Sequence, residues 1–174
     1  MADQLARTFR FRVTLNASPP VPPRPARAGE RREPPAPGPP LGNGAFQECN
    51  GLDLEMDVAE YVEGGRNNGV LQRAGRVKLT RITLRRGMLH PADGSVNADL
   101  WRWFADVVDG VLPLRRYDGV VEVHDETGRV VAKWTFDRGL PAKIVGPQLN
   151  ARTGEVAVEE LQIAHEGLRL AVVS

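Results

Sequence analysis

The 174-residue sequence has a single cysteine, Cys49, which excludes a disulfide within the chain. It has no run of about 18 apolar residues, the length that a membrane-spanning helix requires. The amino-terminal stretch MADQLARTFRF also lacks the apolar region of a secretory signal. We therefore expect a chain that is cytosolic at synthesis, without Sec-type export. With 23 Lys and Arg against 22 Asp and Glu, the net charge of +1 gives no reason to expect nucleic-acid or membrane binding.

Catalytic and metal-binding motifs are missing too. The three histidines (His90, His124 and His165) lack the spacing of a metal site, and no nucleophile elbow, Walker loop or dinucleotide fingerprint occurs. The stretch GGRNNG at 64–69 has the glycines of a phosphate loop but neither its lysine nor its strand-to-helix setting. We expect no enzymatic activity, no cofactor and no bound metal.

Proline is concentrated in one segment. Ten of the fourteen prolines lie within residues 19–40, PPVPPRPARAGERREPPAPGPP, between two stretches that alternate like strands. Proline fixes φ and donates no backbone hydrogen bond, so this segment cannot join a sheet or continue a helix. It is either a docking ligand for an aromatic groove or an acidic partner, or a tolerated surface insertion, because the closure entropy of a loop grows slowly with its length.

Much of the remaining sequence alternates with a period of two, which predicts β-strands. In GLDLEMDVAEY, one face carries Leu52, Leu54, Met56 and Val58, and we expect it to pack between sheets. The other face carries Asp53, Glu55 and Asp57. These carboxylates stand about 7 Å apart along a strand, too far to share a small cation unaided. They are candidates for paired acids, a solvated surface or the lining of a water-filled passage in an assembly.

Further along, residues 62–76 are expected to form a long loop and residues 77–87 a strand. Two strands are expected on either side of a tight turn at DETGR, residues 125–129. LPAKIVGPQL is expected to add a short extended piece. In the last segment the apolar phase changes at Glu159–Glu160, which suggests a β-bulge.

One α-helix is expected between an N-cap at Asn97 and a C-terminal glycine at Gly110. Its core face is formed by Leu100, Trp103, Phe104, Val107 and Val108, which recur at helical spacing. Trp101 lies off this stripe; it either packs on its own domain or contacts a partner. The result is a mainly β domain of about seven strands and one helix, whose open sheet edges favour assembly with other chains.

Four stretches in order, CNGLDLEMDVAEYVEGG, VKLTRITLRRG, WTFDRGLPAKIVGP and EVAVEELQIAHEGL, resemble the phage tail tube protein family. The likeness is to its myovirus-like branch, shared with extracellular contractile injection systems, and covers nearly everything outside residues 16–44. The resemblance implies two packed antiparallel β-sheets (sandwich/barrel-like) with one flanking α-helix. It also implies homo-hexameric rings whose strands join into one barrel, and which stack into a hollow tube inside a contractile sheath.

The resemblance further implies that a loop at Tyr61–Gly75 reaches a neighbouring ring. The residues expected to carry this stacking are Tyr61, Glu63, Gly64, Gly65, Arg66, Asn67, Asn68 and Leu71. Asp53, Glu55 and Asp57 would face the lumen or solvent. Partners would be sheath, baseplate or hub, and tube-terminator proteins, with DNA or effector cargo passing through the lumen without sequence-specific binding and without membrane insertion by this chain.

The departure from the family is the segment 16–44, interpreted as a proline-rich insertion at the tip of the first hairpin of a single domain, 1–174. The flanking strands would still pair with each other. Such an insertion leaves open a second function, a tube-initiator or baseplate adaptor ring that docks a hub or sheath component. A third, a small hydrolase or carbohydrate-binding β-sandwich, lacks the residues for its chemistry.

Overall fold

The structure of the chain is a computed structural model, which describes residues 10–19, 40–41, 46–62, 69–88, 97–150, 152 and 156–171. These residues form one helix and nine strands: β1 (Phe11–Ala17), β2 (Glu48–Asn50), β3 (Leu54–Tyr61), β4 (Leu71–Leu79), β5 (Ile82–Gly87), α1 (Asp99–Val108), β6 (Tyr117–His124), β7 (Val130–Val145), β8 (Val158–Ala164) and β9 (Gly167–Ala171). The mainly β fold with antiparallel sheets and one helix is confirmed.

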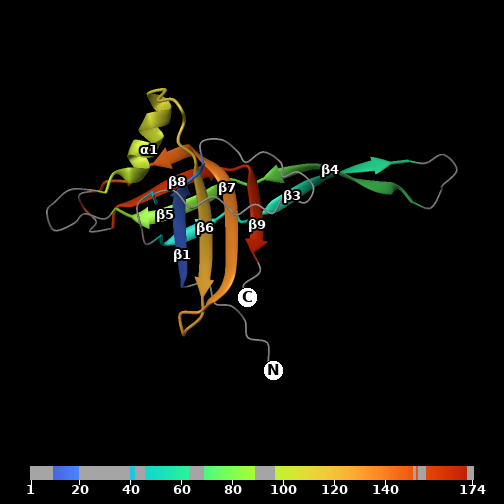
Figure 1. Cartoon of the computed structure of the whole chain (residues 1–174), viewed down its shortest axis with the longest axis horizontal. Coiled ribbons are helices and arrows are strands. Elements are labelled where there is room, and N and C mark those ends of the chain that lie inside the picture. Colours follow the sequence, from blue (N-terminus) through green and yellow to red (C-terminus); the bar gives the residue numbers. More distant parts are fainter. Residues whose placement is uncertain are drawn as a thin grey trace.

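Seven of the strands make two connected sheets (Figure 1). Sheet A contains β1, β6, the first part of β7 and β9, whereas sheet B contains the second part of β7, β8, β5 and β2. All of these pairs are antiparallel. The remaining strands, β3 and β4, pair only with each other among the described residues. They form a two-stranded ribbon that extends away from the rest of the fold, on the side of β9 in Figure 1.

The core lies between the two sheets and under the helix. Sheet A contributes Val13, Leu15, Tyr117, Val121, Phe136 and Leu168; sheet B contributes Ile82, Leu84, Leu161 and Ile163; and α1 contributes Leu100 and Trp103. Along each strand these residues alternate with more exposed ones, as expected for a sheet with one face buried. One apolar cluster therefore holds both sheets and the helix together.

Strand β7 belongs to both sheets because it bends. It is 16 residues long, and its partners change from β6 and β9 to β8 near Arg138 and Gly139. Arg138 has a positive φ of 53°, which a residue with a side chain seldom adopts. A Cβ on Gly139 would come within 2.8 Å of the Tyr117 carbonyl oxygen, so only glycine fits the next position. The expected separate extended piece at residues 140–149 is thus mostly the second half of one strand.

The helix ends as the sequence predicts. Gly110 has φ +70°, and the amides of Gly110 and Val111 donate to the carbonyls of Val107 (3.3 Å) and Asp106 (2.9 Å). This is a Schellman motif, in which a left-handed glycine satisfies the last carbonyls of a helix. At the other end Ala98 is the N-cap residue, but the Asn97 Oδ1 accepts a hydrogen bond from the Asp99 amide at 3.1 Å.

The turn at residues 125–129 joins β6 to β7, as predicted. The Asp125 Oδ1 accepts hydrogen bonds from the Thr127 hydroxyl (2.6 Å) and from the amides of Thr127 and Arg129 (2.9 Å each). Gly128 supplies the positive φ, 85°, that closes the turn.

The expected pairing across the proline-rich segment is wrong. β1 pairs with β6 along its whole length, while β2 pairs with β5 and β3 with β4. Among the described residues, an isolated bridge between Asn16 and Pro40 is the only pairing that connects the two sides of the segment. The apolar residues that alternate along β1 cover the same core as those of β6. Strand β1 therefore pairs with β6, which is distant in the sequence. Most of residues 16–44 lie outside the described residues, so the insertion itself stays a prediction.

The expected bulge at Glu159–Glu160 is also wrong. Strand β8 pairs with β5 in unbroken register, and Glu159 lies on the buried face with Leu161 and Ile163. Its carboxylate pairs there with the buried guanidinium of Arg86 at 2.5 Å. The change of apolar phase in the sequence therefore reflects a buried charge, and the irregular register occurs in β7, between Pro141 and Lys143.

Candidate assembly surface

Sheet A has two open edges, β1 and β9. Neither strand has a continuous second partner among the described residues; β1 has only the bridge at Pro40. Unpaired strand edges offer rows of backbone donors and acceptors to another chain. In Figure 1 the strands of sheet A lie side by side, with β1 and β9 at the two sides. The four strands alternate in direction, so β1 and β9 run in opposite directions.

One face of sheet A is polar. The register aligns Arg12 with Glu122 and Glu122 with Lys133, so charges of alternating sign cross the sheet in one row. The Lys133 Nζ lies 3.3 Å from the Glu122 Oε1. Further polar side chains of this face include Thr14, Asn16, Asp118, His124, Thr135, Asp137 and Arg169. Because the opposite face holds the core, this face is the one that sheet A presents outward.

The β3–β4 ribbon is amphipathic and uncovered. Cross-strand pairs on one face are apolar: Leu54 with Leu79, Met56 with Val77, and Val58 with Ala74. The exposed fractions of Leu54, Met56, Val58 and Val77 are 59, 45, 50 and 54%. The expectation that Leu54 and Met56 pack between sheets within the chain is therefore wrong; of that row, only Leu52 packs against the core.

The opposite face of the ribbon carries charge. Glu55 is paired with Lys78, and the Lys78 Nζ forms an ion pair with the Asp57 Oδ1 at 2.7 Å. Asp53, Glu55 and Asp57 are all exposed. Opposite Asp57 the register shifts by one residue, where a Cβ on Gly75 would lie 2.4 Å from the Asp57 carbonyl oxygen. Gly75 thus lets the ribbon bulge.

The ribbon tip is shorter than the expected loop at Tyr61–Gly75. Strand β3 continues to Tyr61 and β4 starts at Leu71, so residues 71–74 are paired with β3 and Gly75 lies in the bulge of β4, not in a loop. Tyr61 is exposed, with the Arg73 guanidinium carbon 4.6 Å from its ring centroid, and Leu71 is half-buried. The remaining predicted stacking residues, Glu63 to Asn68, lie outside the described residues.

The helix residues singled out in the sequence all lie on α1. Leu100 and Trp103 are buried and Phe104 and Val107 are half-buried, whereas Val108 is exposed. Trp101 is partly exposed, but its indole Nε1 donates to the Glu159 Oε2 at 2.7 Å. Its role as a partner contact stays a prediction.

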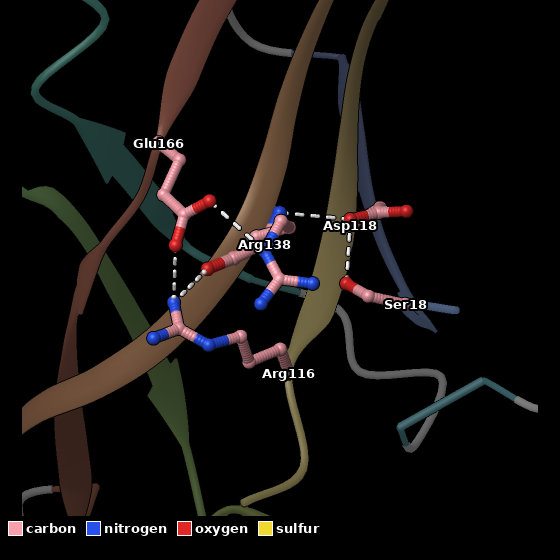
Figure 2. Close-up of polar contacts among 5 residues, drawn as sticks. All are labelled: Ser18, Arg116, Asp118, Arg138 and Glu166. Carbon is pink, nitrogen blue, oxygen red and sulfur yellow. Dashed lines mark hydrogen bonds and ion pairs between the residues drawn. The ribbon is translucent and has the colours of Figure 1, made fainter. Parts of the chain in front are cut away.

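A polar cluster that the sequence did not reveal fixes the bend of β7 (Figure 2). Glu166, between β8 and β9, accepts hydrogen bonds from Arg116 and from Arg138, at 2.9 Å each. Asp118 accepts from the Arg138 amide at 2.8 Å and from the Ser18 hydroxyl at 2.5 Å. These five residues come from four separate parts of the sequence. Their hydrogen bonds connect the ends of β1, β6 and β9 to the bend of β7 and so fix the two open edges relative to each other.

The described residues show little that is suited to reaction chemistry. They contain no group of three or more His, Cys, Asp or Glu placed to hold a metal ion. Burial raises the pKa of the Cys49 thiol to about 11, which keeps it protonated and unreactive at neutral pH. Within these same residues, no helix has the length and apolar character to span a membrane.

The family profile described as "T4-like virus tail tube protein gp19" matches residues 7–169. The chain belongs to this tail tube protein family. It is a structural protein, not an enzyme, and a tube subunit of a contractile phage tail or a tail-like injection particle.

Solved structures share the fold of this tail tube protein. A chain of the anti-feeding prophage baseplate is 22% identical, with 98% of this chain and 97% of that chain covered, at a TM-score of 0.73. A chain of the PVC sheath-tube complex in the extended state is 19% identical, with 97% of this chain and 93% of that chain covered, at a TM-score of 0.68. A chain of the PVC sheath/tube terminator in the extended state is 17% identical, with 99% of this chain and 100% of that chain covered, at a TM-score of 0.71. No curated protein is significantly similar in sequence.

Proposed function

We propose that six copies of this tail tube protein close into a ring by pairing β9 of one copy with β1 of the next. The observation that carries the proposal is an open, two-edged sheet A beside an uncovered apolar ribbon. Four strands per copy is an even number, so each junction between copies is antiparallel, like every pair within sheet A. A closed barrel has no edges, which removes the exposed backbone groups of β1 and β9.

In this ring the polar face of sheet A lines the lumen, and sheet B forms the outer layer. The lumen face carries both signs of charge, among them Arg12, Glu122 and Lys133. Such a face suits the passage of DNA or effector cargo without sequence-specific binding. Asp53, Glu55 and Asp57 lie on the ribbon, and they face solvent or a neighbouring copy.

The ribbon covers the copy that joins at β9. In Figure 1 the ribbon extends beyond the β9 side of the fold. A neighbour that pairs with β9 would therefore lie beside the ribbon, within reach of its apolar face. Burying the four half-exposed side chains of that face is favourable by about 25 cal/mol per Å² of apolar surface. The ribbon tip, from Tyr61 to Leu71, then reaches toward the adjoining ring and supports stacking.

The partners of the stacked tube are a contractile sheath, a baseplate or hub, and a tube terminator. Structures named for a sheath-tube complex, a sheath/tube terminator and a six-fold symmetrised baseplate contain chains of the same fold, which supports this assignment. Assembly takes place in the cytoplasm, before the particle is complete.

The ring is tested by replacing Leu54 with Asp in the full chain. Leu54 is 59% exposed in the single chain, so the variant should fold normally. At a concentration at which both proteins are monomeric, its circular dichroism spectrum and melting temperature should match those of the wild type. It should remain monomeric by light scattering, because a charge in the subunit contact lacks a partner. The matched control, Glu55→Lys, changes the opposite face and should still form rings visible by electron microscopy.

One result would reject the ring, and another would reject the ribbon contact. A wild-type chain that stays monomeric at high concentration would show that its edges need no partner. A Leu54→Asp variant that assembles like the wild type would show that the apolar face of the ribbon lies outside the subunit contact.

The adaptor ring is a second candidate, favoured by the proline-rich segment between β1 and β2. A bulk tube subunit should form long uniform tubes alone, whereas an adaptor should stop at single rings and bind a hub or sheath component. Deleting residues 20–39 distinguishes a docking role from a tolerated insertion: unchanged assembly and particle activity would exclude docking.

A further inference from the structure

An exposed apolar segment joins α1 to β6. Every residue from Val108 to Arg115 is exposed, including the cis-bonded Pro113. Four large aliphatic side chains project from it: Val108 (71% exposed), Val111, Leu112 (80% exposed) and Leu114. Monomeric proteins seldom expose contiguous apolar patches of this kind, and those they do expose often mark interaction sites.

The segment is held in a defined conformation. The Schellman motif at Gly110 fixes its start. At its end, the Arg115 carbonyl accepts a hydrogen bond from the Trp103 indole at 2.9 Å, and the Arg116 carbonyl accepts one from the Ser18 amide at 2.8 Å. A preorganised apolar surface loses little conformational entropy when a partner covers it.

The segment lies at one end of the strands of sheet A. It leads directly into Tyr117, the first residue of β6, beside Ala17, the last residue of β1. The β6–β7 turn at residues 125–129 lies at the opposite end. Figure 1 shows α1 and the start of β6 at one end of these strands and the turn at the other. Barrel strands tilt by about 35–45° from the axis, so these two ends face along the tube.

We propose that the segment 108–114 packs against the opposite strand end of a second copy of this chain in the adjoining ring. This inference rests on the proposed ring. It adds a contact between rings that is separate from the ribbon tip. Near the receiving end, Val131 of β7 is an exposed apolar side chain. The turn also carries the acidic Asp125, whose carboxylate accepts hydrogen bonds within the turn, and Glu126. Its exposed basic residue, Arg129, would face the acidic Asp109 beside the segment.

The experiment replaces both Val108 and Leu112 with Asp in the full chain. Both side chains are largely exposed in the single chain, so at a concentration at which both proteins are monomeric the melting temperature should remain that of the wild type. Rings of wild-type mass should still form, but tube length in electron micrographs should fall at least tenfold. The control is Leu149→Asp, a residue 87% exposed in the connection after β7, and it should leave tube length unchanged.

Three results would overturn the inference: tubes of wild-type length, loss of the rings themselves, or intact tubes that fail only to recruit a sheath. The second would place the segment within the ring, and the third would make it a sheath contact. Failure of the proposed ring is distinguishable from all three, because then the wild-type chain itself would not form rings.

Discussion

The buried ion pair between Arg86 and Glu159 makes a strong prediction about stability. Both side chains are almost fully buried, and their Nε and Oε1 atoms are 2.5 Å apart. In Glu159→Ala, Arg86 would keep, among the described residues, a single 3.3 Å hydrogen bond from Nη2 to the Asn97 carbonyl, and the Trp101 indole would lose its acceptor. Removing one partner of a buried pair costs about 3–5 kcal/mol. For a domain of this size each kcal/mol lowers the melting temperature by about 2–4 °C, so a fall of about 6–20 °C is expected.

The matched variant removes both charges. Arg86→Met combined with Glu159→Leu fills similar volume without leaving a charge unpaired, and such replacements are often neutral or stabilising. It should therefore melt well above Glu159→Ala. Thermal unfolding is followed by circular dichroism at a concentration at which the chain is monomeric. If Glu159→Ala melts within about 1 °C of the wild type, the guanidinium is not held in a closed interior and the reasoning is refuted.

Two further predictions concern the β6–β7 hairpin. Hydrogen bonds, the largest from the Thr127 hydroxyl, hold the pKa of Asp125 below its usual value, so the turn is stabilised above about pH 4 and loses that stabilisation as the pH falls through the lowered pKa. Asp125→Asn should flatten this acid dependence, measured by amide exchange of residues 127–129; an unchanged profile would count against the assignment. At Gly119 a Cβ would lie 2.0 Å from the ring of buried Phe136, so Gly119→Ala should lower the unfolding free energy by about 1–3 kcal/mol in urea titrations, and an unaltered midpoint would contradict the packing.

Local structure could be predicted from the sequence where neighbouring residues determine it. The helix between Asn97 and Gly110 and the turn at 125–129 each depend on hydrogen bonds within a few residues. Strand pairing depends on residues far apart in the sequence. The local pattern therefore predicts the wrong partner for β1, which pairs with β6. The buried Glu159 was also missed, since a carboxylate on a strand resembles a solvated residue until its partner, Arg86, is placed beside it.

The candidate surface could be predicted only in part. Alternation identified the apolar row that contains Leu54 and Met56, but the pattern of one chain does not distinguish a core from a contact between copies. The polar face of sheet A could not be predicted, for a related reason. Its charges, such as Arg12 and Lys133, come from strands that adjoin only after the long-range topology is formed.

The bend of β7 has a mechanical consequence for the proposed tube. Sheet A, the inner layer of that tube, and sheet B, its outer layer, share one continuous polypeptide, and the arginine–carboxylate cluster of Figure 2 supports the place where it turns. A force applied to sheet B would thus be transmitted to sheet A through the covalent backbone of β7. Separating the two sheets would require more than shear between their packed faces.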